Sequence, residues 1–157
     1  MGINPSFPST LSEEWKAFHA SLLAKTYFRY FNEPLLKNAP PTFQNLFEFP
    51  FILLSHGIQA DPVLNFGSRR ALQLWELTWD ELTQMPSRLT AEPMEREARS
   101  QFMETVRRQG FVENYEGIRV SKSGRRFKIQ NAKVWNLIDP QNIHHGQAAY
   151  FETWTDL

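Results

Sequence analysis

The chain has 157 residues, in which 17 Lys and Arg balance 17 Asp and Glu, and it contains no cysteine. This length is typical of one domain with a single core. The balanced charge excludes a general electrostatic attraction to nucleic acid or to an anionic membrane, and the lack of cysteine excludes disulfides, thiolate metal sites, cysteine nucleophiles and thiol-linked cofactors. No segment has the pattern of a secretory signal or a membrane span, so we expect a cytoplasmic protein without membrane contact.

The amino-terminal region has two features. Residues 1–10 include two prolines and little else that could anchor the chain, so this segment is predicted to be disordered. Thr10 and Glu13 then have the spacing of a capping box, in which each side chain satisfies an orphan amide of the first helical turn. A helix is therefore predicted over residues 11–31.

The apolar residues of this helix occupy more than one stripe: Trp15, Phe18, Leu22, Leu23, Tyr27, Phe28 and Phe31. Such a helix must be covered on two sides. We expect a second copy of the chain to cover one side, which makes a homodimer through the helix from Leu11 to Phe31. The alternative is that Leu35, Leu36 and the segment from Phe43 to Phe47 fold back over that side of a monomer.

Apolar periodicity and turn residues predict the other elements: strands over 47–55 and 63–66, helices from near Ser68 to Leu77 and over 79–85 and 93–109, and strands over 112–121, 126–138 and 143–154. Thr78 and Glu81 form a second capping box, and Gly110 ends the longest of these helices. Pro50 places part of the first strand at an edge or a bulge. The order predicts an α+β fold, with a five-stranded antiparallel sheet, short helices on one face and an N-terminal amphipathic helix.

Three segments of the chain carry a family resemblance. They are SHGIQADPVLNFGSRRALQLWELTWDELTQMPSRLTAEP from Ser55 to Pro93, GIRVSKSGRRFKIQNAKVWNLID from Gly117 to Asp139, and HGQAAYFETW from His145 to Trp154. These segments resemble the MEKHLA family of PAS-like domains, and the order of elements is the one that the PAS fold uses. The resemblance implies a single PAS-like domain over residues 11–157. It implies a sensory or interaction domain and no catalysed reaction.

In PAS-like folds a ligand lies between the inner face of the sheet and the short helices. On this resemblance, seven residues are predicted to line a ligand pocket: Trp75, Phe102, Met103, Tyr115, Asn131, Trp135 and Gln147. Alternation along the strand over 126–138 puts Asn131 and Trp135 on the same face as Phe127. Asn131 is then a polar amide among apolar neighbours, and its hydrogen-bond partner is either a protein group or a ligand.

Cofactor expectations follow from the same resemblance. Gln147 is similar in place to the glutamine with which light-oxygen-voltage (LOV) domains contact a flavin ring. Those domains need a reactive cysteine for their photochemical adduct, so no covalent flavin or thiol-linked chromophore is expected in this chain. A PAS haem usually hangs from a histidine on the long helix before the last three strands, and residues 93–110 contain none. Haem and metal are therefore not expected, and the cofactor, if any, stays unknown.

The basic residues Lys122, Arg125, Arg126 and Lys128 fall at a hairpin turn. Alternation separates them from the intervening Phe127, so they predict a solvated hairpin rather than a nucleic-acid site. We expect a noncatalytic sensory domain that binds a small molecule or mediates protein association. Two alternatives are a purely structural dimerisation module with a filled core, and a small enzyme in which a buried His beside an Asp or Glu transfers protons.

Overall fold

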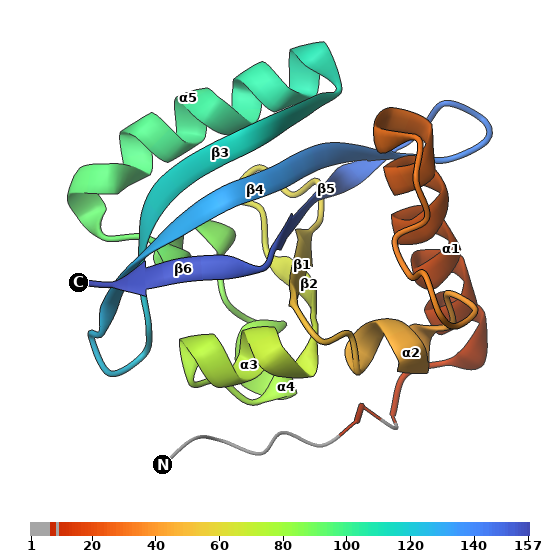
Figure 1. The fold of residues 1–157 in the computed structure, drawn as a ribbon, viewed down its shortest axis with the longest axis horizontal. Helices are drawn as coiled ribbons and strands as arrows, with labels where there is room; N and C mark the ends of the chain where they lie inside the picture. The colour runs from red at the N-terminus through yellow and green to blue at the C-terminus, as the bar shows by residue number, and fades with distance from the viewer. Residues whose placement is uncertain (1–6, 9) are drawn as a thin grey trace.

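The computed structural model describes residues 7, 8 and 10–157, apart from the side chains of Pro93 and Met94. The elements in chain order are α1 (Glu13–Phe31), α2 (Phe43–Phe47), β1 (Ile52–His56), β2 (Leu64–Gly67), α3 (Arg69–Trp75), α4 (Trp79–Leu82), the 3₁₀ helix η1 (Ser87–Thr90), α5 (Pro93–Gln109), β3 (Phe111–Val120), β4 (Arg126–Ile138), β5 (His144–Phe151) and β6 (Thr153–Asp156) (Figure 1). The predicted sequence of a helix, two strands, short helices and a closing antiparallel meander is confirmed.

The strands form one antiparallel sheet in the order β2-β1-β5-β4-β3, and β6 also pairs with β4. The sheet thus has six strands, where five were predicted. β6 continues the register of β5 along β4, because Lys133 lies opposite Tyr150 and Gln130 lies opposite Thr153. The predicted strand over 143–154 is therefore present, and an irregularity at Glu152 divides it into two. The predicted α+β architecture with an antiparallel sheet holds.

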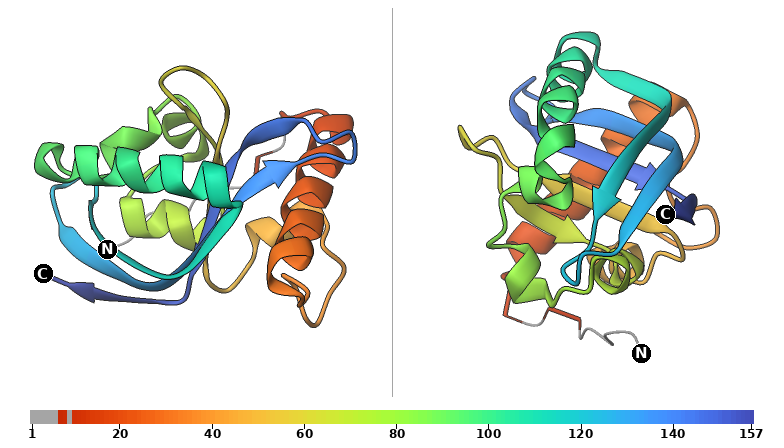
Figure 2. Two further views of the ribbon diagram at one scale, coloured as in Figure 1. Left: turned by 90° about the horizontal axis from the view of Figure 1, so that it is seen from above. Right: turned by 90° about the vertical axis from the view of Figure 1, so that its left-hand side faces the viewer.

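Helices cover both faces of this sheet, with α5 on one side and α1 on the other (Figure 2). On the inner face, Trp75 of α3 packs with Phe127 of β4 and Phe151 of β5 in one apolar cluster. On the outer face, Tyr27 of α1 packs against Trp135 of β4 in a second cluster. Residues that alternate along a strand belong to different clusters, so the face of each strand residue decides whether it lies on the side of α5 or on the side of α1.

A bulge in β4 changes which residues face inward. Tyr115 lies opposite Ala132 and Gly117 lies opposite Ile129. The two pairs are two residues apart on β3 but three residues apart on β4, so β4 holds one extra residue here. Asn131 is exposed within this bulge and has a left-handed backbone with φ of 53°. The prediction that Asn131 is a buried amide is wrong, because uninterrupted alternation was assumed and a bulge shifts the faces by one residue. The same shift moves Trp135 to the outer face.

The α1 helix begins later than predicted and its own chain covers it. Ser12, and not Thr10, is the N-cap, since the Ser12 side chain accepts a hydrogen bond of 3.1 Å from the Trp15 amide. The apolar side chains that complete the cover come from the following segment and are buried: Leu35, Phe43 and Leu46. The monomeric alternative therefore accounts for the second buried side of α1, and the predicted homodimer stays a prediction.

Two further predictions are adjusted around α2. Phe47 belongs to α2 and not to a strand, because Thr42 caps a helix by accepting from the Asn45 amide at 3.1 Å. The strand begins only at Ile52, so Pro50 precedes it. Residues 1–6 and 9 of the segment predicted to be disordered lie outside the described residues, while the Phe7 ring contacts Phe47 edge to face with centroids 5.5 Å apart.

Local signals set the start of α4 and both ends of α5 correctly. Thr78 and Glu81 form the predicted capping box at the start of α4, with hydrogen bonds of 3.1 and 3.0 Å. That helix ends at Leu82 rather than at residue 85. Pro93 opens α5 and Gly110 caps it, as predicted.

Candidate functional site

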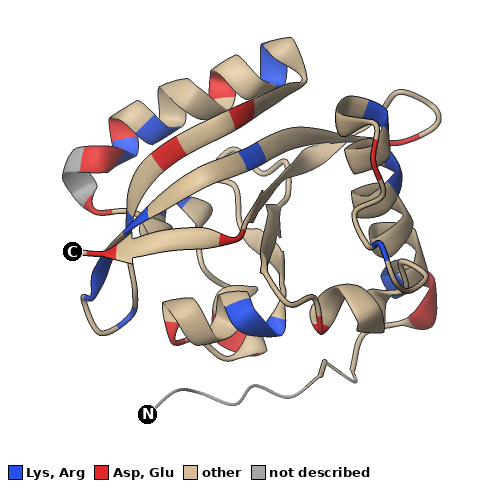
Figure 3. Ribbon diagram, in the orientation of Figure 1, with Lys and Arg blue, Asp and Glu red and all other residues tan. Residues whose placement is uncertain are grey.

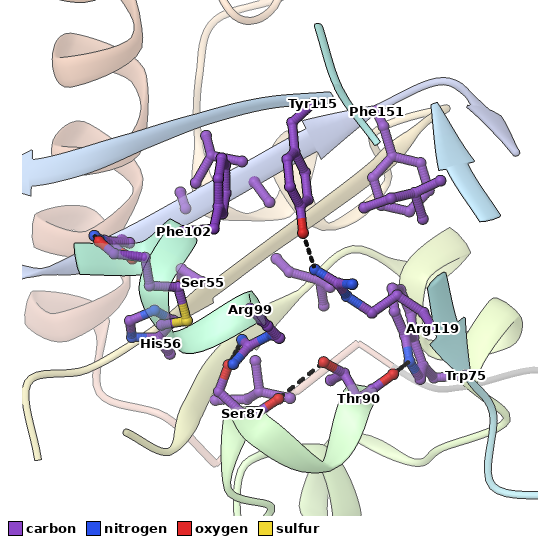
Figure 4. A pocket seen from close by; sticks show the side chains of 18 residues that line it. Ser55, His56, Trp75, Ser87, Thr90, Arg99, Phe102, Tyr115, Arg119 and Phe151 are labelled. Atoms are coloured by element: carbon purple, nitrogen blue, oxygen red, sulfur yellow. Dashed lines mark hydrogen bonds between the residues drawn. The ribbon is translucent and has the colours of Figure 1, made fainter. Parts of the chain in front are cut away.

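A cavity of about 70 Å³ lies between α5 and the inner face of the sheet (Figure 4). Its walls come from eight elements, because β1, β2, α3, η1, α5, β3, β4 and β5 all contribute residues. The α5 residues Arg99, Phe102 and Met103 recur at helical spacing and close it from one side. The cavity therefore depends on how α5 docks on the sheet.

Aromatic side chains form one wall. The rings of Phe102 and Tyr115 stack with centroids 3.7 Å apart and planes 17° from parallel, which joins α5 to β3. Trp75 is buried, and its indole N–H donates to the Thr90 carbonyl at 3.5 Å. These contacts make the wall apolar and leave the Tyr115 hydroxyl as its polar edge.

A row of polar side chains crosses three neighbouring strands on the opposite wall. His56 of β1 lies opposite Gln147 of β5, which lies opposite Asn136 of β4. Asn136 Nδ2 donates to the carbonyls of Val106 and Arg107 at 3.2 and 3.0 Å. Its amide oxygen therefore points to Gln147 and accepts from Gln147 Nε2 at 3.2 Å. These bonds tie the last turn of α5 to the sheet.

Gln147 has one polar atom without a partner. Its Nε2 also donates to the Met103 carbonyl at 2.8 Å, which fixes the orientation of the amide because a carbonyl can only accept. Gln147 Oε1 is consequently buried, with no hydrogen-bond partner among the described residues. Buried polar atoms almost always have partners. The charged form of His56 would bond Gln147, so this oxygen lacks a donor while His56 is neutral with its proton on Nδ1.

His56 lies beside this acceptor in its neutral form. Its Nδ1 donates to the Gly57 carbonyl at 2.8 Å, so the neutral ring leaves a lone pair on Nε2. Burial lowers the pKa of His56 to about 4, because the imidazolium is poorly solvated there. The close approach of β1 and β5 at this point requires Gly146, since a Cβ there would lie 1.8 Å from the His56 carbonyl oxygen.

Two arginines supply the positive charge of the cavity. Arg119 of β3 is 8% exposed and donates to the Ile118 carbonyl at 2.9 Å and to the Tyr115 hydroxyl at 3.3 Å. Arg99 of α5 donates to Ser87 Oγ, and burial together with the charge of Arg119 lowers its pKa to about 10. Among the described residues, no Asp or Glu lines this cavity or forms an ion pair with either guanidinium.

Comparison with known proteins identifies the domain. The profile of the MEKHLA domain matches residues 17–156. The chain belongs to the MEKHLA family. This match confirms the resemblance carried by the three quoted segments. No curated protein matches the sequence.

Solved structures show the fold of this MEKHLA domain. The PAS domain of a protein from Colwellia psychrerythraea is 12% identical, with a TM-score of 0.60 over 73% of this chain and 92% of that chain. A fungal LOV photoreceptor is 17% identical, with a TM-score of 0.57 over 86% of this chain and 91% of that one. The blue-light photoreceptor Aureochrome1 LOV is 12% identical, with a TM-score of 0.56 over 76% and 87%. At these identities the likeness concerns the fold alone.

The structure brings five of the seven predicted pocket residues of the MEKHLA domain around one cavity: Trp75, Phe102, Met103, Tyr115 and Gln147. Asn131 and Trp135 do not reach it. Trp135 is fully buried on the outer face, where its indole N–H donates to Thr26 Oγ1 at 2.8 Å. The bulge at Asn131 is the physical reason in both cases, and Asn136 takes the place of the inward amide.

Sequence reasoning missed the charged side chains of the cavity, although both had a signal. Arg99 precedes Phe102 and Met103 by three and four residues, so helical periodicity places it on their face. Arg119 alternates with Gly117 and Tyr115, so it shares their side of the strand. In both cases the signal was a charged residue on the face of the element that also carries the predicted pocket residues.

A flavin does not fit this cavity. Its volume of about 70 Å³ is far below the roughly 300–1,000 Å³ of pockets that hold drug-sized ligands. Trp75, Phe102 and Arg119 take up the space between the sheet and α5. Gln147 was expected at the place of the flavin-contacting glutamine of LOV domains, but the volume of the cavity that it lines suits a much smaller molecule.

Other candidate features lie elsewhere on the MEKHLA domain. His145 Nε2 and Asp139 Oδ2 are 2.8 Å apart near the turn between β4 and β5, away from the cavity. In the basic hairpin, Lys122 pairs with Glu81 and Arg126 with Glu92, and charges of both signs are interspersed over the fold (Figure 3). In the described part of the chain, no three acidic or histidine side chains are grouped to hold a metal ion. No described helix is long and apolar enough to cross a membrane.

Proposed function

We propose that this MEKHLA domain is a noncatalytic sensory domain that binds a small molecule in the cavity beneath α5. The observation that carries the proposal is the buried oxygen of Gln147, a residue that lines this cavity, since that oxygen has no hydrogen-bond donor among the described residues. An unsatisfied buried polar group costs about 1–3 kcal/mol, and a bound donor would offset this cost.

Occupancy of the cavity would act on α5. Gln147 bonds the Met103 carbonyl of α5, and Phe102 of α5 stacks on Tyr115, so an occupant touches the contacts that dock this helix on the sheet. A helix held by few contacts changes its position or stability when one of them changes. The ligand signal would thus leave the domain through α5.

A proton-transfer enzyme has less support. Proton transfer requires an acid and a base within hydrogen-bond reach of the substrate. His56 is the only histidine among the described residues that line the cavity, and no carboxylate lines it. The cavity offers recognition groups rather than an acid and base pair.

Native mass spectrometry of protein purified from its own source tests the proposal. We expect a bound small molecule that is released on denaturation. In the variant Ala149→Leu, which adds methyl groups at the cavity wall, the bound mass should be lost. Ala17→Leu, which makes the same change at an exposed site on α1, should retain it. A wild-type protein without any bound mass, which no small molecule stabilises against heat, would refute the sensory function.

Self-association through α1 is a second candidate function. The observation that favours it is the exposure of two large side chains on this helix, Phe18 at 44% and Phe28 at 54%. Light scattering tests it with the double variant Phe18→Lys/Phe28→Lys. The matched control is Ile58→Lys/Ile143→Lys, which replaces apolar residues exposed elsewhere. We expect a dimer for the wild type and the control and a monomer for the α1 variant, whereas a monomeric wild type at micromolar concentration excludes this function.

A further inference from the structure

Two guanidinium groups converge on the cavity without a negative charge between them. Arg99 comes from α5 and Arg119 from β3, and in Figure 4 Arg99 lies between His56 and Arg119. Arg119 donates hydrogen bonds to the Ile118 carbonyl and the Tyr115 hydroxyl, and Arg99 donates one to Ser87 Oγ. All of these acceptors are neutral. Each guanidinium has five N–H donors, so both retain donors and their full charge.

Arginines on the surface of the domain, in contrast, form ion pairs with carboxylates. Arg69 pairs with Glu48 at 2.6 Å, and Arg126 pairs with Glu92 at 2.7 Å. Charges in a buried site are costly unless they are paired. Two neighbouring cations in a cavity repel each other as well, so an anion placed between them would relieve both costs.

The fold makes room for the cationic group of β3. At Gly117 an added Cβ would lie 2.7 Å from both Arg119 Nη1 and Tyr115 Oη. Glycine at this position therefore lets the guanidinium fold back toward the Tyr115 ring, whose centroid lies 5.7 Å from Arg119 Cζ. The Arg119 side chain is placed by its neighbours and does not simply fill space.

A second hollow next to the cavity is also rich in arginine. It shares His56, Arg99, Met103 and Gln147 with the cavity, so the two adjoin. Its further charged side chains are Arg88, Arg96 and Arg107 on the positive side and Asp61 and Glu104 on the negative side. The excess of positive charge raises the local concentration of anions beside the cavity.

Part of the cavity wall is apolar, and its side chains include Leu54, Leu64, Ile129 and Phe151. An inorganic anion would leave this wall without a partner, whereas an organic acid would cover it. The planar guanidinium fork also matches the geometry of a carboxylate. The volume of about 70 Å³ restricts the acid to a small one.

We propose that the cavity binds a small organic carboxylate, with its carboxylate group at Arg99 and Arg119 and its carbon chain or ring against the apolar wall. A hydroxyl or amino group on the acid would donate to Gln147 Oε1 and so satisfy the remaining buried acceptor. This inference rests on the proposed sensory function and names the chemical class of its ligand.

Calorimetric titration of the full chain tests the inference with acid and amide pairs of the same shape. The probes are propanoate, lactate and benzoate, the corresponding neutral amides, and inorganic phosphate. We expect at least one acid to bind about tenfold or more tightly than its amide, since a charged hydrogen-bonded contact is worth that factor. The acid and amide comparison needs no variant, so it is independent of any folding defect.

Variants then locate the charge recognition. Arg119→Gln and Arg99→Gln should each weaken the acid about tenfold and leave the amide affinity unchanged. Arg126→Gln, an arginine that pairs with Glu92 outside the cavity, is the matched control and should bind the acid as the wild type does. Equal binding of acid and amide, binding of phosphate alone, or no binding of any acid at millimolar concentration would overturn the inference. A neutral molecule found by native mass spectrometry would also overturn it and leave the sensory function standing.

Discussion

Replacing Trp135 by alanine tests whether this residue is a structural anchor of α1. Trp135 was predicted at the ligand pocket, but its indole ring is fully buried on the outer face of the sheet. It meets the Tyr27 and Phe31 rings edge to face, with centroids 5.1 and 5.8 Å away. Its N–H donates to Thr26 Oγ1 at 2.8 Å. All three partners belong to α1.

The expected loss of stability follows from these contacts. An aromatic side chain of this size buries about 150–250 Å², which at about 25 cal/mol per Å² is worth about 4–6 kcal/mol. Measured truncations of buried Phe or Trp to Ala cost about 3–5 kcal/mol, because the alanine keeps one carbon and the cavity partly relaxes. The lost hydrogen bond contributes about 1 kcal/mol of this. We therefore expect the free energy of unfolding of Trp135→Ala to fall by about 4 kcal/mol.

Urea unfolding followed by circular dichroism measures this change. In a chain of this length, 1 kcal/mol corresponds to about 2–4 °C in Tm, so a parallel thermal scan should show a drop of about 8–16 °C. The conservative variant Trp135→Phe keeps most of the ring contacts and loses the N–H donor, and we expect it to cost about 1–2 kcal/mol. A loss below about 2 kcal/mol for Trp135→Ala would refute the anchoring role.

Three further outcomes are expected. Burial lowers the pKa values of His19 and His56 to about 4, so below pH 6.5 these side chains take up protons in the unfolded chain and stay neutral in the native protein. The free energy of unfolding should therefore fall by about 1 kcal/mol per histidine between pH 7 and 5.5, and in His19→Gln the drop measured by urea unfolding should be smaller by about this amount. Gly146→Ala should lower the free energy of unfolding by about 3 kcal/mol or more, because the new Cβ would meet the backbone of His56. Gly124→Ala, at a position with positive φ but no neighbour within 4 Å, should lower it by about 1–2 kcal/mol, and equal losses in the two variants would contradict the close contact at Gly146. Asn131→Leu should lose about 1–2 kcal/mol from its left-handed backbone while Asn131→Gly is nearly neutral, and a larger loss in the glycine variant would mean that the amide itself stabilises the fold.

Local chemistry made several elements predictable from the sequence. The capping box of Thr78 and Glu81 and the limits of α5 at Pro93 and Gly110 depend on groups within a few residues of each other. Such signals do not depend on the rest of the fold. Thr10 shows their limit, because Ser12 is an equally good cap nearby and the helix begins there.

The pocket was predictable to the extent that its residues lie on regular elements. Phe102 and Met103 follow from the periodicity of α5, and Gln147 follows from alternation in β5. Asn131 and Trp135 were misplaced because the face of a strand residue is set by pairing with its neighbours, and the bulge shows only in the register of β4 against β3. A single extra residue moves every side chain beyond it to the other face.

The sequence by itself determined that this chain contains an α+β domain of the MEKHLA family, since the family segments and the order of elements can be read directly along the chain. Only the tertiary structure decided which groups meet in the cavity. Arg99 and Arg119 are 20 positions apart and belong to different elements. No local pattern predicts that both line the same cavity and that no carboxylate lies beside them there. Helical and strand periods place a side chain on a face, but charge compensation depends on which other elements pack against that face, and this is settled only when the chain folds.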